Sequence, residues 1–393
     1  MSIFKQIGAV TTVALEALPQ RLGTSLIAVI GTATVASVLI SVLAVATGFG
    51  RAAAKAGSPD RAIILGGLTE ASSNISRANV ATIADAPGLA DSASGMPMVS
   101  AELLEFVPLT ERRTGVDVYV AVRGVGPEGL VLRPEIHVVA GRRFQPGKHE
   151  VIVSRTLEYR LDGLGIGSGI RLLDGDWRVV GIFSSGGDAH DSEILTDASS
   201  LMSAYHRNAF NSMTVQLASP QDFTRFSAAL MNDPALSVQA EREVEYYAKI
   251  SRPISQLLKI IAYGIGSIMA FGAMFGALNT MYATVGARRT EIATLRAIGF
   301  DGMPVIASVV IEALLLGIVG ALLGAVVAWV LINGSTISMM GPLPPSQVTF
   351  GVEVGPRLIL IGTIFALGIA AVGGGFAARR ALLIPVAAAM QAT

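Results

Sequence analysis

The chain has 393 residues, of which 52% are hydrophobic and 15% charged, and its formal net charge is zero. So high an apolar fraction is unusual for a soluble protein, and the neutral balance gives no basic footprint for nucleic-acid binding. The chain has no cysteine, which excludes disulfides, thiolate metal sites and a cysteine nucleophile.

Four segments are long and apolar enough to cross a bilayer, which takes about 20 apolar helical residues. They lie at about 22–48, 257–285, 304–332 and 357–377. The first is longer than the apolar part of a signal peptide and starts too far along the chain for one. We therefore expect an uncleaved anchor, and a polytopic α-helical membrane protein with four transmembrane helices.

The basic residues near the ends of these segments predict how the chain is oriented, because they favour the cytoplasmic side. Seven of them fall on one side of the membrane if both termini are cytoplasmic, whereas the loop at about 333–356 has no lysine or arginine. We therefore expect residues 51–252 to be extracytoplasmic. The seven basic residues are Lys5, Arg21, Arg288, Arg289, Arg296, Arg379 and Arg380.

Residues 51–252 have the pattern of an α/β domain with two small lobes inserted between the first two helices. Residues 116–122 alternate apolar and polar side chains as a half-buried strand does. A strand at 150–154 precedes a short helix, and 169–185 is typical of a β-hairpin with Asp174 and Gly175 at its turn. The other expected elements are strands in 61–68, near 98–107 and from 213, helices around 76–86 and after Ser219, and a polar helix leading into the second span.

No catalytic or nucleotide-binding motif occurs in this region, and G-x-x-x-x-G-K-[ST] occurs nowhere in the chain. The segment GGDAHDSE, 186–193, gathers Asp188, His190, Asp191 and Glu193 as a metal loop can. A solvated flexible loop is the favoured interpretation. We expect no catalytic residue, no metal and no cofactor on this chain.

The segment GARRTEIATLRAIGFDG, 286–302, is charged although it lies between two apolar spans. On a helix, Ile292 and Leu295 project to one side, while Arg288, Glu291 and Arg296 occupy the polar side. From periodicity alone, the favoured interpretation is a helix that lies at the membrane interface.

The sequence NTMYATVGARRTEIATLRAIGF, 279–300, resembles a signature of the permeases of the MacB/FtsX/LolC/LolE family, the type VII ABC transporters. Ala287 and Ala293 depart from it, where the family usually has Glu and Gly. The third span and the C-terminal tail continue the likeness, although Ile384 and Ala387 replace acidic residues of the family tail. Residues 138–183 are similar to the periplasmic core of the same family. The matching residues are Asn279, Arg288, Glu291, Ile292, Leu295, Arg296, Ala297, Ile298 and Gly299, then Glu312, Leu316, Gly320 and Gly324, then Arg379, Arg380, Pro385 and Val386.

The resemblance implies a permease subunit of a bacterial ABC transporter, in the inner membrane, that works by mechanotransmission. ATP and Mg would bind a separate ATPase, and its action would move the periplasmic domains to export or extract a lipid, peptide or lipoprotein-like substrate. The implied partners are two ATPase copies, a second permease copy or a related permease, and a periplasmic adaptor or substrate carrier. The alternative is an FtsX-like regulator that activates a periplasmic cell-wall hydrolase or sensor. The residues that would contact the ATPase are Arg288, Arg289, Glu291, Ile292, Leu295 and Arg296.

Two polar residues are expected inside the spans, Asn279 and Glu312. Glu312 is costly there unless it is paired or hydrated, so we expect it either to pair with an arginine of 286–302 or to lie near the interface. Two small-residue pairs, Gly272/Gly276 and Gly320/Gly324, allow close helix contact within or between subunits.

The expected domains follow from these assignments. They are an N-terminal helix and first span at 1–50, the periplasmic α/β domain at 51–252, the second span at 253–285, a cytoplasmic coupling helix at 286–302, the third span at 303–333, a short periplasmic loop at 334–356, and the fourth span with a cytoplasmic tail at 357–393.

Overall fold

The structure is a computed structural model that describes residues 12, 22–173, 175–287, 302–340 and 347–382. The chain divides into two compact units. The helical unit comprises Met1–Ala46, Gln256–Ser335 and Val352–Thr393, and the α/β unit comprises Thr47–Ser255 and Thr336–Gly351.

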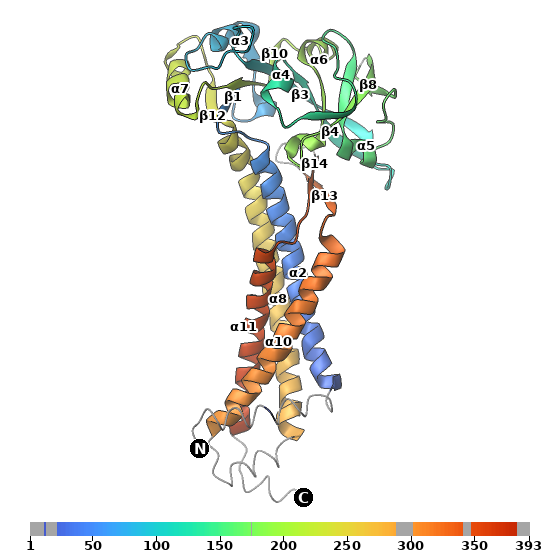
Figure 1. The fold of residues 1–393 in the computed structure, drawn as a ribbon, viewed down its shortest axis with the longest axis vertical. Coiled ribbons are helices and arrows are strands. Elements are labelled where there is room, and N and C mark those ends of the chain that lie inside the picture. The colour runs from blue at the N-terminus through green and yellow to red at the C-terminus, as the bar shows by residue number, and fades with distance from the viewer. Residues whose placement is uncertain (1–11, 13–21, 174, 288–301, 341–346, 383–393) are drawn as a thin grey trace, which may run out of the picture. The chain divides into compact units, whose positions relative to one another are not determined.

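Four helices are long and apolar enough to cross a membrane, and each contains one of the predicted spans (Figure 1). The predicted fold class is therefore confirmed. The second helix starts at Glu243 rather than near 257, because the polar helix predicted before the span is continuous with it through Pro253. The four helices are α2 (Leu22–Lys55), α8 (Glu243–Ala287), α10 (Gly302–Ile332) and α11 (Pro356–Leu382).

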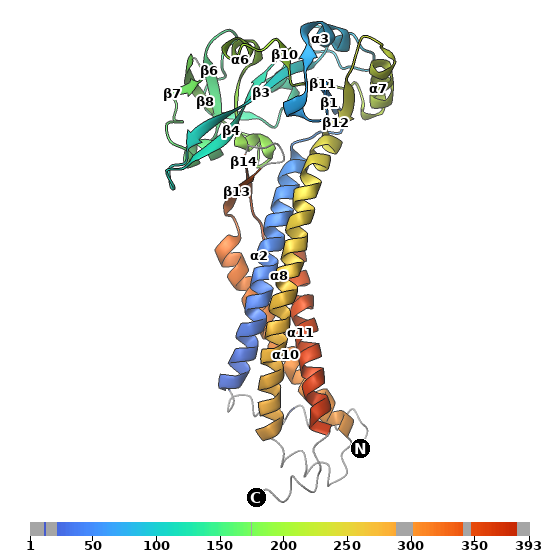
Figure 2. The same ribbon diagram turned by 180° about the vertical axis from the view of Figure 1, so that it is seen from behind.

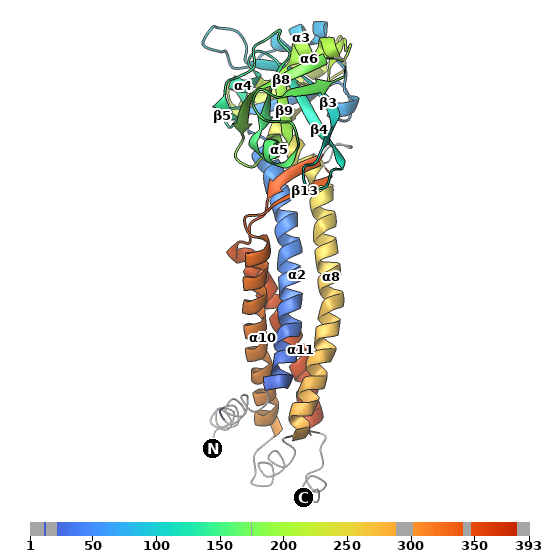
Figure 3. The ribbon, with the colours of Figure 1, turned by 90° about the vertical axis from the view of Figure 1, so that its right-hand side faces the viewer.

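Glycines set the close contacts of the helical unit, whose helices run side by side (Figure 3). A Cβ at Gly324 of α10 would lie 2.4 Å from the Ala33 carbonyl oxygen of α2, and one at Gly320 would lie 2.9 Å from the Val29 carbonyl oxygen. This pair therefore packs within one chain. A Cβ at Gly272 or Gly276 of α8 would meet nothing within 4 Å, so neither glycine is required for close contact with another described helix.

One ten-stranded sheet forms the α/β unit, in the order β12-β1-β11-β3-β4-β9-β6-β8-β5, with β7 paired to β8 (Figure 2). Residues 99–102 of β3 pair with β11, and residues 103–110 pair with β4. The two predicted lobes are thus two halves of one sheet that share β3. The strands are β1 (Arg61–Leu65), β3 (Val99–Thr110), β4 (Asp117–Val125), β5 (His137–Gly141), β6 (Glu150–Ser154), β7 (Gly169–Leu172), β8 (Gly175–Ser184), β9 (Glu193–Asp197), β11 (Ser212–Gln216) and β12 (Gln239–Arg242).

Each lobe has its own apolar core. In the first lobe, Ile83 and Phe226 pack helices α3 and α7 against β1 and β11. In the second, Leu157 and Leu201 pack α5 and α6 against a sheet face that contains the buried Trp177. The smaller elements are α3 (Arg77–Ala84), α4 (Gly129–Leu132), α5 (Arg155–Arg160), α6 (Ala198–Ala204), α7 (Phe223–Asn232), β2 (Ile75–Ser76), β10 (Ala209–Phe210), and the 3-10 helices η2 (Glu70–Ser72), η3 (Ala189–Ser192) and η4 (Pro220–Asp222).

Most of the local predictions are confirmed, including the strand at 150–154 and the helix after it, which Ser154 caps by accepting a hydrogen bond from the Leu157 N–H at 3.1 Å. Of the predicted turn at Asp174 and Gly175, Asp174 lies outside the described residues and Gly175 is not in the turn. Gly175 pairs with Leu172 and so belongs to β8, and the positive φ of 42° falls on Leu173.

The segment between the third and fourth helices, predicted only as a loop, contains a β-hairpin. Its strands β13 (Thr336–Met340) and β14 (Gln347–Gly351) are antiparallel and belong to the α/β unit.

Candidate functional site

The predicted ATPase-contacting residues lie outside the described residues. That assignment stays a prediction for Arg288, Arg289, Glu291, Ile292, Leu295 and Arg296.

The two predicted intramembrane polar residues lie on different helices. Glu312 of α10 is 5% exposed, and it lies six residues, or about 9 Å, into the candidate span Ile306–Ile332. Its neighbour Ala313 packs in a cluster with Met281 of α8, whereas Asn279 of α8 is exposed. The arginines expected to pair with Glu312 lie outside the described residues, so that pairing stays a prediction.

The titratable side chains of the segment 186–193 are buried, and the prediction that it is a solvated loop is wrong. Asp188 is 1% exposed and His190 is fully buried. The Asp188 carboxylate accepts hydrogen bonds from the Ser185 hydroxyl and the His190 N–H, and Asp191 accepts one from the Ser185 N–H at 2.8 Å. These carboxylates hold the segment's own backbone. Across the described ranges, no three metal-ligating side chains gather as a metal site requires.

A buried guanidinium lies where the two lobes meet. Arg123 of β4 is 3% exposed and donates to Glu193 from Nε and Nη2 at 2.9 and 2.8 Å. Its Nη1 donates to Glu70 at 2.5 Å and to Glu102 at 3.0 Å. The three carboxylates come from η2, β3 and β9, so one side chain joins elements of both lobes.

Two further arginines extend this arrangement to the first residue of α8. Arg133 donates to both oxygens of Glu102, at 2.6 and 3.2 Å, and lies 3.8 Å from Glu243. Arg61 of β1 donates to Glu243 at 2.5 Å and to Glu135 at 2.6 Å. We call the whole set the buried charge cluster; it comprises Arg61, Arg123, Arg133, Glu70, Glu102, Glu135, Glu193, Glu243 and His190.

Pairing counteracts the effect of burial on the pKa values of Glu102, Glu193 and His190. Burial raises the pKa of Glu102, but the charges of Arg133 and Arg123 outweigh it and leave that pKa below its usual value. The pKa of Glu193 is lowered in the same way, against burial, by Arg123 and His190. For His190, burial lowers the pKa and Glu193, 2.9 Å from Nδ1, outweighs that effect, so the pKa is raised. Breaking such a buried pair typically costs about 3–5 kcal/mol, because it leaves a charge uncompensated.

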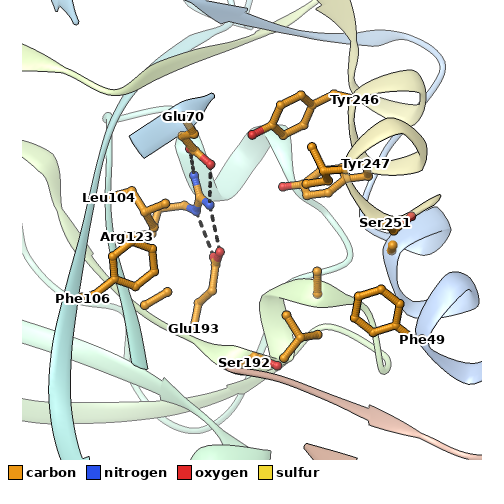
Figure 4. Close-up of a pocket in the computed structure, with 15 residues that line it drawn as sticks. Phe49, Glu70, Leu104, Phe106, Arg123, Ser192, Glu193, Tyr246, Tyr247 and Ser251 are labelled. Carbon is orange, nitrogen blue, oxygen red and sulfur yellow. Dashed lines mark hydrogen bonds and ion pairs between the residues drawn. The ribbon is translucent and has the colours of Figure 1, made fainter. Parts of the chain in front are cut away.

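A cavity of about 70 Å³ lies beside the buried charge cluster (Figure 4). Arg123 and its partners form one wall, and Tyr246 and Tyr247 of α8 direct their hydroxyl groups toward the same space. Phe49 of α2 lines the opposite part, together with small and aliphatic side chains. The cavity therefore borders on α2 and α8 as well as on the sheet.

The β13–β14 hairpin is hydrogen-bonded to the second lobe. The Thr349 N–H donates to the Ser192 hydroxyl at 2.7 Å, and Arg160 of α5 donates to the Thr349 hydroxyl at 3.0 Å. Phe350 packs edge to face on Phe49 with ring centroids 5.5 Å apart. The hairpin thus contacts both the second lobe and Phe49 of α2.

Sequence reasoning missed the buried charge cluster, although one signal was present. Glu102 lies inside an apolar strand, whereas Arg123 falls on the same side of the alternating stretch 116–122 as Asp117, the side that the pattern assigns to solvent. A charged residue in a predicted core position calls for a buried partner. Which of the chain's arginines would be the partner of Glu102 depends on the pairing of distant strands, which no local pattern specifies.

Models of two protein families match the chain. That of the FtsX-like permease C-terminal domain matches residues 263–386, and that of the MacB-like periplasmic core domain matches residues 25–232. An uncharacterized ABC transporter permease of Methanocaldococcus jannaschii is 25% identical over 167 residues, covering 41% of this chain and 42% of the relative. The match thus spans less than half the length of that relative.

Two solved structures are also similar to parts of the chain. The extracellular domain of the noncanonic ABC-type transporter YknZ from Gram-positive bacteria is 18% identical, with a TM-score of 0.34, and the match covers 43% of this chain and 89% of that one. The periplasmic region of MacB from Actinobacillus actinomycetemcomitans is 11% identical, with a TM-score of 0.38, and the match covers 50% and 94%.

Proposed function

This chain belongs to the MacB/FtsX-type family of ABC transporter permeases, and we propose that it works by mechanotransmission. It is a multi-pass membrane protein with a large α/β domain between its first two membrane helices. In the proposed cycle, a separate ATPase binds ATP and Mg, docks on residues 286–302 and displaces the helices. The α/β domains of two permease copies then move relative to each other in the periplasm.

The observation that carries this proposal is that α2 and α8 each contribute residues to both compact units. Neither helix ends at the boundary between the units. The first residue of α8, Glu243, is bound to Arg61 of β1 inside the buried charge cluster. Tyr246 and Tyr247, one turn further along, pack with Ile63 and Leu65 of the same strand. A shift of α8 would therefore act on the sheet through buried ion pairs and packed side chains rather than through a flexible linker.

The β13–β14 hairpin supports the same proposal from the other pair of helices. It begins four residues after α10 ends at Ile332 and finishes five residues before α11 begins at Pro356. The hydrogen bonds of Thr349 to Ser192 and Arg160 would pass movement of α10 and α11 to the second lobe. All four membrane helices would then move the α/β domain.

We assign the chain to the bacterial inner membrane, with both termini cytoplasmic and its substrate a lipid, peptide or lipoprotein-like molecule. The basic residues near the predicted spans support the orientation. The family implies an ATPase partner, and the chain has no nucleotide-binding motif of its own.

Recovery of the ATPase by the permease tests this function. Glu291→Lys reverses a charge in the proposed docking helix, and loss of one member of an interfacial charge pair typically costs about 2–5 kcal/mol. We expect ATPase recovery from mild detergent to fall by well over tenfold, at about 1.4 kcal/mol per factor of ten. Glu245→Lys, an exposed charge reversal at the start of α8, is the matched control and should not alter recovery. Equal recovery with both variants would refute the docking assignment.

A further inference from the structure

The cavity beside the buried charge cluster has the chemistry of a ligand site. Aromatic rings line it on several sides, and the one guanidinium in its wall, Arg123, lies between Glu70 and Glu193. The remaining lining side chains are mainly aliphatic. A cavity of about 70 Å³ accommodates about five non-hydrogen atoms, since one water needs about 10–15 Å³ of the same measure.

The buried charge cluster holds three guanidiniums against five carboxylates. The Glu135 side chain is 25% exposed, so protonation of His190 balances the four buried carboxylates. Asp188 and Asp191, which are also buried, add negative charge beyond this balance. An uncompensated negative charge inside a protein is unfavourable, so a cation entering the cavity would be attracted to this wall.

A second observation points to a missing polar partner. The Tyr246 side chain lines the cavity, and its residue is 2% exposed. Its hydroxyl is buried and makes no hydrogen bond of ordinary geometry within the described chain, although it lies near the Glu70 backbone. Figure 4 shows this hydroxyl directed toward the space in front of Glu70 and Arg123. Buried hydroxyl groups are normally hydrogen-bonded, and a ligand with an N–H group would supply the partner.

We propose that this cavity binds an organic cation, namely a primary ammonium or guanidinium group on a short apolar stem. The cationic head lies against the Glu70 carboxylate, which it shares with the Arg123 guanidinium. The Tyr246 hydroxyl oxygen accepts a hydrogen bond from the head, and the stem packs between Phe49 and Phe106. The ring faces of tyrosine and phenylalanine attract cations, which favours this head over a neutral one. Binding here does not require the ATPase.

Ligand-observed NMR on the full chain in detergent tests the proposal, with n-butylammonium, 1-butanol and n-butyrate as probes of equal stem length. We expect n-butylammonium to bind about tenfold or more tightly than the alcohol, and butyrate not to bind. Glu70→Gln should weaken n-butylammonium binding by about tenfold. Glu105→Gln, which removes a carboxylate that pairs with Arg207 away from the cavity, is the control and should leave binding unchanged.

Ala53→Leu separates cavity binding from partition into the detergent, because Ala53 lines the cavity and leucine would fill it. This variant keeps every charge and should abolish the n-butylammonium signal. If Glu70→Gln does not fold, Ala53→Leu still tests whether n-butylammonium binds in the cavity. Equal binding of the ammonium and the alcohol, or an n-butylammonium signal that persists in Ala53→Leu, would overturn the proposal.

Discussion

Removing the Glu243 carboxylate should release the start of α8 from the first lobe. Its side chain is 1% exposed, and Oε2 accepts hydrogen bonds from Arg61 Nε at 2.5 Å and from the Ser58 N–H at 3.0 Å. Truncating one partner of a buried ion pair costs about 3–5 kcal/mol. Arg61 keeps Glu135 at 2.6 Å after Glu243→Ala, so we expect the lower end of that range, about 3 kcal/mol.

The matched control lies two residues along the same helix. Glu245 is 66% exposed at its side chain and lies 3.7 Å from Arg242, so Glu245→Ala should cost less than about 1 kcal/mol. Hydrogen exchange of β1 and of the first turn of α8, followed by mass spectrometry, measures the difference. At about 1.4 kcal/mol per tenfold change, Glu243→Ala should speed exchange by about 100-fold and Glu245→Ala by less than about fivefold. If both variants exchange within about fivefold of wild type, the ion pair does not fix the helix.

Three further outcomes are expected. Because the chain has no cysteine, a single cysteine at Ser199 should react with an impermeant reagent in spheroplasts, and one at Thr290 should not; the reverse pattern would contradict the topology. Gly324→Ala should reduce the yield of folded protein, since a Cβ there would lie 2.4 Å from a backbone oxygen of α2, whereas Gly272→Ala should be tolerated; equal yields would contradict the packing. Burial raises the pKa of Asp188 from 3.8 to about 6, so the stability it contributes is present below about pH 3.8 and lost as the pH rises through about 6. Asp188→Asn should remove that loss. Relative to wild type, the variant's free energy of unfolding should therefore rise by up to about 3 kcal/mol between about pH 4 and about pH 7; no relative change would refute the raised pKa of Asp188.

The elements governed by local sequence were predictable, and those governed by distant pairing were not. The four apolar helices and the strand at 150–154 follow from run length and β-branched composition. The strand near 98–107 was also predicted, but not that it would be divided between two lobes, because its pairing with β11 and β4 depends on residues far away in sequence. The hairpin in 334–356 gave no signal beyond a polar, proline-containing loop.

The segment 186–193 shows why composition misled. Four charged or titratable side chains in eight residues, beginning with two glycines, are typical of an exposed loop. In the fold, Asp188 and Asp191 are turned onto the segment's own N–H groups, and Glu193 opens strand β9 beside Arg123. Asp188 and Asp191 are held by groups within a few residues of them, and only the pairing of Glu193 with Arg123 depends on a partner that the tertiary structure supplies. The residues predicted to contact the ATPase all lie in 288–301, outside the described residues, and their role stays a prediction.

The central claim is that ATP hydrolysis moves the α/β domains through α8 and the buried charge cluster. A spin label on a cysteine replacing Ser199, in a complex of two permease copies with the ATPase, reports the distance between the two domains. The account predicts that this distance shifts when ATP is trapped on the wild-type complex. It also predicts that the shift is lost in Glu243→Ala while the ATPase still turns over. An unchanged distance during ATP hydrolysis by the wild-type complex would contradict mechanotransmission.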